Sequence, residues 1–283
     1  MPNTPSIDRD AWPVLDPTAF RNAVRHWITA NWATGITVRE WWRRLADAGL
    51  TVPTWSTALG GIGATTTVQQ IVEQELGRIA TIAPPLAGVG VHLVGPALRQ
   101  HGTDEQRRLL LPGILDGTAN WCLLFHEPSD GDDTLEVDAE AARAATGWTI
   151  DGIKLSTDAD LADRGLMLAR TDPDSVGRDG LTCFLLSLDQ PTISAQRLAS
   201  GGSVVVCRGA TAGAADVLGE PGTGWQVAQT VFAHQQTSLA GRIRRGLIDV
   251  PSGTKAGNLD RTTGDVLTYT KGRPAPDHER RRR

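Results

Sequence analysis

The spacing of apolar residues changes near residue 118, and this change constrains the fold more than any other feature. Before it, apolar side chains recur every three to four residues, as they do on one face of a helix. After Trp121 they occur in short or alternating runs separated by Gly, Asp and Pro, as in antiparallel strands. Helices followed by a run of strands predict an α+β protein.

Local signals mark where the expected helices begin and end. Asp16 followed by Pro17 suits the start of a first helix, because Asp caps helices and Pro fits the first turn. Thr103 and Gln106 form the pattern of a capping box, and we expect their helix to run to Pro112 or a little beyond. A last helix is expected over residues 225–239.

The segment between these helices carries the strand signals. Expected strands cover residues 166–170, 181–188 and 204–207. Asp151-Gly152 lies between two alternating runs, and this dipeptide favours a type I′ turn, so residues 149–154 predict a two-residue hairpin.

Composition limits the class of protein. A chain of 283 residues with 40% apolar residues can bury a sizeable core, and its net charge of −4 argues against a nucleic-acid partner. No apolar run reaches membrane-spanning length, and residues 1–10 lack the pattern of a signal peptide. Cys122, Cys183 and Cys207 show no metal-ligand spacing, so we expect a reduced cytoplasmic protein.

Residues 121–133 are the stretch that best suggests a binding site. An apolar run of strand length meets Glu127-Pro128, where the ladder must stop or lie at an edge, and a Ser-Asp-Gly-Asp-Asp turn follows. Such a turn can expose several backbone N–H groups in one concavity and so bind a polar-edged ligand. A plain strand followed by a turn remains the alternative.

Five segments in order resemble the acyl-CoA dehydrogenase family. They are residues 102–117, 121–133, 147–154, 168–173 and 217–225. The resemblance runs from about Trp12 to Arg242 and implies a helical N-terminal domain (1–117) and an antiparallel, β-barrel-like middle domain (118–222). Only the first helix of a truncated C-terminal helical domain is then expected (223–245). We expect residues 246–283, which are rich in Gly, Thr, Pro and basic residues, to be disordered.

The resemblance also implies a chemistry. The family uses FAD to remove two hydrogens from an acyl-CoA thioester and passes the electrons to an electron-transfer flavoprotein. Its catalytic base is a glutamate late in the chain, and this sequence has no glutamate in a matching motif. By resemblance the cofactor-binding positions are Leu123, Phe125, His126, Ser156 and Asp158, and the substrate-binding position is Asp132.

Several of these positions depart from the family pattern. His126 and Asp158 stand where the family has Ser or Thr, Ser156 stands where it has a stacking Trp, and Asp132 stands where it has Ser. We therefore expect weak FAD binding. Two functions stay open: an acyl-CoA dehydrogenase, or an inactive truncated paralogue or structural subunit that pairs with a full-length homologue.

Overall fold

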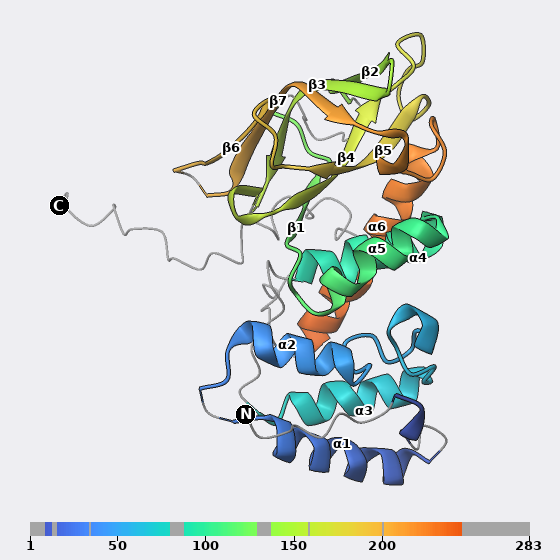
Figure 1. Cartoon of the computed structure of the whole chain (residues 1–283), viewed down its shortest axis with the longest axis vertical. Coiled ribbons are helices and arrows are strands. Elements are labelled where there is room, and N and C mark those ends of the chain that lie inside the picture. The colour runs from blue at the N-terminus through green and yellow to red at the C-terminus, as the bar shows by residue number, and fades with distance from the viewer. Residues whose placement is uncertain are drawn as a thin grey trace, which may run out of the picture. The chain divides into compact units, whose positions relative to one another are not determined.

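The computed structural model describes residues 9–12, 16–33, 35–79, 88–128, 137–157, 159–199 and 201–244. Two of the predicted site positions, Asp132 and Asp158, lie outside these residues, as does the predicted tail 246–283. In the described part of the chain, no helix has both the length and the apolar character needed to cross a membrane. The described part has helices up to residue 115 and a mixed sheet after it (Figure 1), so the predicted fold class is confirmed.

Three helices, α1 (Pro17–Asn31), α2 (Val38–Asp47) and α3 (Thr66–Leu76), share one hydrophobic cluster. Its central side chains are Phe20, Val24, Trp41, Leu45, Val68 and Ile71. The carboxylate of Asp16 accepts hydrogen bonds from the backbone N–H groups of Thr18 and Ala19, and this confirms the predicted start of the first helix. A short 3₁₀ turn, η1 (Arg9–Ala11), precedes α1, and another, η2 (Thr57–Leu59), lies between α2 and α3.

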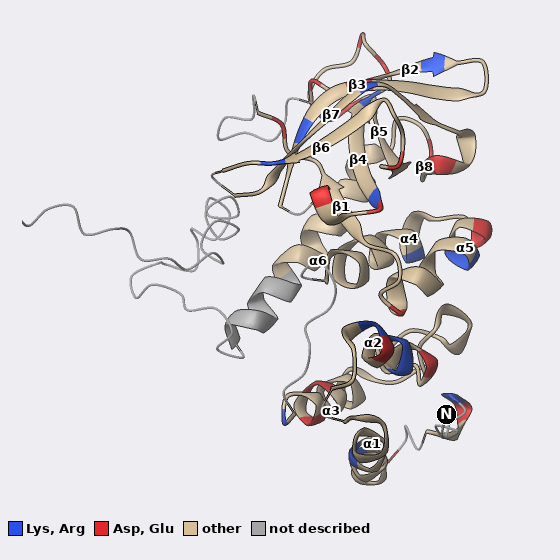
Figure 2. Ribbon diagram, turned by 60° about the vertical axis from the view of Figure 1, so that its left-hand side comes forward, with Lys and Arg blue, Asp and Glu red and all other residues tan. Residues whose placement is uncertain are grey.

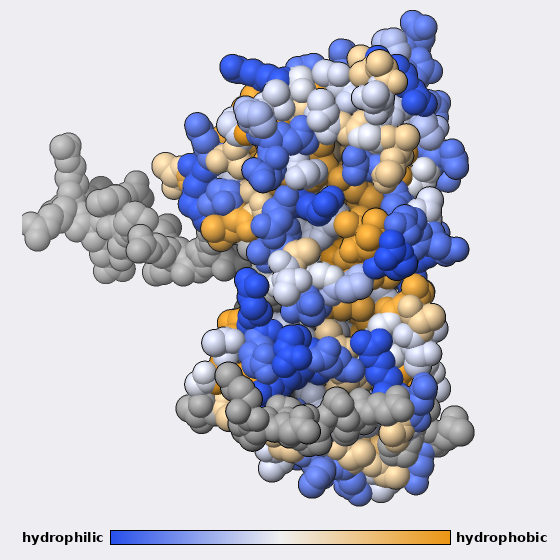
Figure 3. All heavy atoms as spheres, viewed as in Figure 1, coloured by the Kyte–Doolittle hydropathy of each residue, from blue (hydrophilic) through white to orange (hydrophobic). Residues whose placement is uncertain are grey.

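The outer face of α2 is charged. Arg43 and Arg44 both bind Glu40, and Arg43 also binds Asp47, one helical turn away (Figure 2). In Figure 3 the visible surface over α2 is hydrophilic for this reason.

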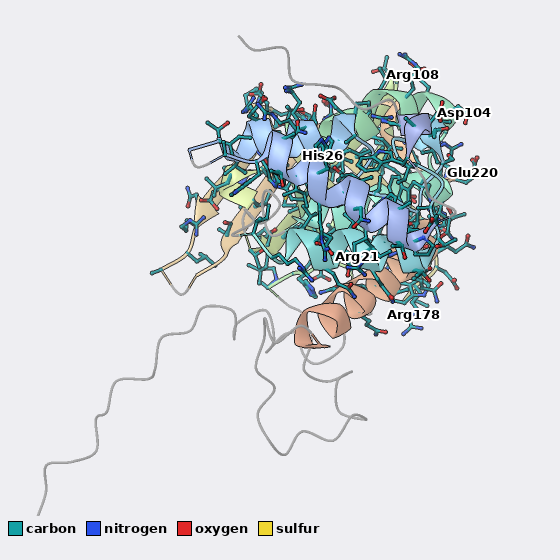
Figure 4. The ribbon with its side chains drawn as sticks, turned by 90° about the horizontal axis from the view of Figure 1, so that it is seen from below. Arg21, His26, Asp104, Arg108, Arg178 and Glu220 are labelled. Atoms are coloured by element: carbon teal, nitrogen blue, oxygen red, sulfur yellow. The ribbon has the colours of Figure 1, made fainter. Side chains whose placement is uncertain are left out.

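A second ionic group joins α1 to α3. The buried carboxylate of Glu75 accepts hydrogen bonds from Arg21, whose Nη1 lies 2.6 Å away, and from Arg25, whose Nε lies 2.7 Å away (Figure 4 labels Arg21). Arg78 contributes a longer contact of 3.4 Å. Three guanidinium groups therefore offset the desolvation of one carboxylate.

The next helices, α4 (Gly95–His101) and α5 (Asp104–Leu115), belong to a different cluster. A π-helical turn, η4 (Gly90–Val94), precedes α4. Their buried side chains belong to the cluster of the strands, which Ala46 of α2 also joins. The predicted capping box is confirmed: the Gln106 N–H donates to Thr103 Oγ1 at 3.1 Å, and the Thr103 N–H donates to Gln106 Oε1 at 2.9 Å.

The strands form a mixed sheet. They are β1 (Trp121–Leu124), β2 (Glu140–Ala144), β3 (Gly147–Ser156), β4 (Arg164–Arg170), β5 (Leu181–Ser187), β6 (Ile193–Arg197), β7 (Ser203–Ala212) and β8 (Val217–Leu218). Their order is β6-β7-β3-β2-β4-β5-β8, and β1 pairs with β4. Most pairs are antiparallel, as predicted, but β1 and β2 each pair with β4 in parallel. Two strands, β2 and β3, separate β1 from β4 in the chain.

The predicted hairpin at Asp151-Gly152 is wrong. β3 continues through both residues, and the reversal lies between β2 and β3 instead. The register with β7 shifts between Ile150 and Asp151, and Asp151 Oδ1 accepts a hydrogen bond of 2.8 Å from the N–H of Gly209. A Cβ at position 152 would lie 2.5 Å from the Cβ of Ala139, so a close approach to the neighbouring segment explains the glycine.

The last described helix is α6 (Gly224–Arg244), which covers and extends the predicted 225–239. Val227, Ala228 and Val231 are buried in the cluster of the strands. Thr230 also contacts α4, because its hydroxyl lies 2.8 Å from Nε2 of His101. The α6 helix is therefore attached both to the strand region and to α4.

Candidate functional site

The candidate site lies where β1 and β3 end. The chain leaving β1 makes one antiparallel bridge to β3, in which the N–H of Leu155 donates to the carbonyl of His126 at 2.8 Å. The structure thereby brings His126 close to Ser156, the last residue of β3. Both side chains are half-buried.

The other two described positions lie deeper. Leu123, within β1, pairs with Leu166 of β4 and is half-buried. Phe125 is buried, and its ring lies 5.8 Å from the ring of Phe232 in α6. These two side chains are part of the packing between β1, β4 and α6.

A buried ion pair lies directly behind this strand end. The Lys154 ammonium donates a hydrogen bond to Glu127 Oε1, and both side chains are buried. The Glu127 carboxylate also accepts hydrogen bonds from the N–H of Asp138 at 2.7 Å and from that of Ala139 at 3.0 Å. One carboxylate thus joins the end of β1, the segment before β2, and β3.

This pairing was missed from the sequence. Glu127 and Lys154 are 27 positions apart, and no short-range rule connects them. The available signal was a lysine an even number of positions from Trp148 and Ile150, and therefore on the same face of an alternating strand. A lysine at such a position requires a buried acid.

A second cluster of hydrogen-bonded polar side chains lies beside Ser156. Ser156 pairs with Ser203 of β7, whose hydroxyl donates to Asp160 Oδ1 at 2.5 Å. Arg197 of β6 donates from Nε to Asp160 Oδ2 at 2.8 Å. The Ser203 hydroxyl and, to a smaller extent, the Arg197 guanidinium hold the pKa of Asp160 below its usual range.

A shallow hollow of about 450 Å³ lies between α4 and α6, away from the strand end. Its lining includes His101, His234, Thr230 and three glutamines. Burial lowers the pKa of His101, and burial together with the positive charge of Arg99 lowers the pKa of His234. Both imidazoles therefore favour the neutral form.

Comparison with known proteins places this architecture in a family. The family model described as acyl-CoA dehydrogenase, N-terminal domain, matches residues 18–118. The acyl-CoA dehydrogenase IpdE1 of Mycobacterium tuberculosis is 32% identical over 244 residues, which are 78% of this chain and 63% of that protein. The chain belongs to the acyl-CoA dehydrogenase family.

Other acyl-CoA dehydrogenases match shorter parts. FadE34 of M. tuberculosis is 34% identical over 184 residues, which are 63% of this chain and 26% of that protein. The chain thus spans about a quarter of the length of FadE34 and less than two thirds of IpdE1.

Solved structures share the fold. A G363A variant of the Tcur3481-Tcur3483 steroid ACAD superposes with a TM-score of 0.67 at 26% identity, covering 81% of this chain and 65% of that one. The ChsE4-ChsE5 complex from M. tuberculosis gives a TM-score of 0.62 at 19% identity, covering 84% and 68%. The second likeness shows the fold alone.

The described residues at the strand end do not fit a stacked flavin. Ser156 offers no flat surface, and the rings of the strand region are engaged elsewhere. Phe125 packs on Phe232, whereas Trp148, at the opposite end of β3, packs on Phe184 with ring centroids 5.8 Å apart. Relatives of this family use FAD, and one solved neighbour is a glutaryl-CoA dehydrogenase in complex with FADH2.

Proposed function

We propose that this chain is a non-catalytic subunit of a heteromeric acyl-CoA dehydrogenase. The observation that carries the proposal is a contrast at one strand end. Behind the ends of β1 and β3, Glu127 and Lys154 form a buried ion pair. The positions in front of it, His126 and Ser156, carry side chains that do not suit a flavin.

The positions outside the described residues extend this proposal. Asp158 stands for a hydroxyl residue of the family and Asp132 for a serine that contacts acyl-CoA. A negative charge at either position would repel the phosphates of FAD or of CoA. In this proposal neither proton abstraction nor flavin binding is assigned to this chain.

The proposed partner is a homologous acyl-CoA dehydrogenase chain. Two of the similar structures support this choice, since one is named by two chains, Tcur3481-Tcur3483, and the other is titled a complex of ChsE4 and ChsE5. The word steroid in the first name makes a steroid acyl-CoA the substrate class to test first.

The alternative is that this chain itself oxidises an acyl-CoA with FAD and reduces an electron-transfer flavoprotein. Family membership and the retained strand framework favour this second candidate. It requires His126 and Ser156 to support flavin binding in place of a hydroxyl and an indole.

Co-expression separates the two candidates. The chain would be purified alone and together with a homologous acyl-CoA dehydrogenase chain of the same genome, and FAD per chain would be measured from absorbance after gel filtration. We expect the chain alone to be colourless and the pair to form a yellow complex that oxidises acyl-CoA with an artificial electron acceptor. A variant of the partner's base, Glu to Gln, should abolish activity without breaking the complex.

Stoichiometric FAD and acyl-CoA oxidation by the isolated chain would overturn the subunit proposal in favour of the second candidate. If no homologous chain binds, the proposed heteromer is wrong.

A further inference from the structure

The ion pair between Glu127 and Lys154 is placed where few other contacts hold the strands. β1 takes its ladder hydrogen bonds from β4. Among the described residues, its continuation meets β3 through a single bridge, from Leu155 N–H to the His126 carbonyl. The two charged residues flank that bridge, because Glu127 follows His126 and Lys154 precedes Leu155.

Stability alone explains this pair poorly. Removing two charges from water is costly, and apolar side chains of similar size often stabilise a core as well or better. Apolar side chains, however, cannot accept the N–H groups of Asp138 and Ala139 while also holding β3. The carboxylate supplies direction, because three donors from two segments must meet its two oxygens.

We propose that Glu127 and Lys154 are positioning residues, which fix His126 and Ser156 at the ends of β1 and β3. The carboxylate ties residue 127 to the segment before β2, and the ammonium ties it to β3, so the bridge between His126 and Leu155 is held from both sides. The proposal concerns only the geometry at the ends of β1 and β3, and its test is independent of the proposed function.

The decisive variant removes both charges together. E127Q/K154M approximately keeps the size of both side chains and removes both charges of the pair, whereas either single change would remove one and leave the other in place. E75Q is the matched control, since Glu75 is also a buried carboxylate paired with cations, but in the α1–α3 cluster.

Two local measurements on the full chain report on the ends of β1 and β3. The first is amide hydrogen exchange at Leu155, whose N–H makes the bridge. The second is the ring signal of His126 in a chain with ¹³C-labelled histidine, assigned by comparison with H126Q. The thermal midpoint of each variant reports global stability separately.

In E127Q/K154M we expect a midpoint within a few degrees of wild type, about 10-fold faster exchange at Leu155 and a shifted or broadened His126 signal. In E75Q we expect a lower midpoint with both local readouts unchanged. Exchange at Leu155 within about 2-fold of wild type in the double variant would overturn the proposal. An equal response in E75Q would also overturn it, because the readouts would then follow global stability.

Wild type and all variants are measured as the full chain without any partner. If the co-expression experiment fails, hydrogen exchange at Leu155 and the His126 signal still test the positioning role.

Discussion

The ring of Phe125 meets the ring of Phe232 edge to face, with centroids 5.8 Å apart and an interplanar angle of 79°. This contact joins the end of β1 to α6, and Trp225 extends it with a centroid distance of 6.1 Å from Phe232. A residue next to the candidate site is thus held by a helix that begins about 100 positions later.

The first prediction concerns this contact. F125A should cost about 3–5 kcal/mol of unfolding free energy because its ring is buried, and F232A about 2 kcal/mol because its ring is half-buried. In a double-mutant cycle measured by urea unfolding, the ring pair itself should contribute about 0.5–1.5 kcal/mol. Q229A, on the exposed face of the same helix, is the control and should change little. Strict additivity of F125A and F232A would contradict the contact.

The second prediction concerns pH and Glu75. Burial alone would raise the pKa of this carboxyl, but the hydrogen bonds from Arg25 and Arg21 outweigh it and lower the pKa from its ordinary value of 4.5. A lowered pKa in the folded state stabilises the fold above the unfolded value, and this stabilisation is lost as the pH falls below about 4.5. We expect the thermal midpoint of wild type to fall as the pH drops below about 4.5 and through the lowered pKa of Glu75.

E75Q should be less stable than wild type at pH 7, and the difference should shrink as the pH falls below about 4.5, as followed by circular dichroism. E105Q is the matched control, because Glu105 also pairs with an arginine but its side chain is 64% exposed and screened by solvent. If E105Q and E75Q flatten the pH dependence equally, the buried cluster is not its source.

The third prediction concerns Gln106. Its side-chain N–H₂ donates to the carbonyls of Ala215 at 2.8 Å and Val217 at 2.7 Å, so it joins α5 to the start of β8. Its oxygen completes the capping box with Thr103. Q106A leaves these buried groups without partners and should cost about 2–3 kcal/mol. T103A removes only a cap and should cost about 1 kcal/mol.

Chemical denaturation would measure both variants, with the exposed Gln100→Ala of α4 as a control expected to be near neutral. A cost for Q106A no larger than that for T103A would mean that the contact with residues 215–217 does not stabilise the fold.

Local chemistry made part of this fold predictable. The capping box of Thr103 and Gln106 spans three positions, so the sequence alone indicates it, and the structure has it. The strand β2 was missed because Glu-Ala-Ala-Arg-Ala favours a helix by propensity. It is a strand because β3 pairs with it, and Arg143 lies over the ring of Trp148, 4.1 Å from its centroid.

Non-local contacts decided the rest. Asp151-Gly152 has the composition of a hairpin turn. Instead, both residues lie within β3, and the Asp151 carboxylate accepts a hydrogen bond from the N–H of Gly209 on β7. In the same way, Lys154 depends on Glu127, which a sequence pattern read along one strand does not reveal. The end of β1 before Glu127-Pro128 could be predicted from the sequence, whereas the contacts of Glu127 and Lys154 could not.

The last prediction concerns the cofactor. The isolated chain should bind FAD weakly or not at all, because Ser156 provides no ring to stack on the isoalloxazine. S156W should lower the dissociation constant roughly 2- to 10-fold, since an aromatic pair contributes about 0.5–1.5 kcal/mol beyond area burial. Flavin fluorescence quenching on titration measures this, and circular dichroism checks that the variant is folded. I153W is the matched control, because Ile153 is 46% exposed on the same strand and its indole should not reach the same site. An equal gain from I153W, or a tightly held flavin in the wild-type chain, would contradict the assignment of position 156.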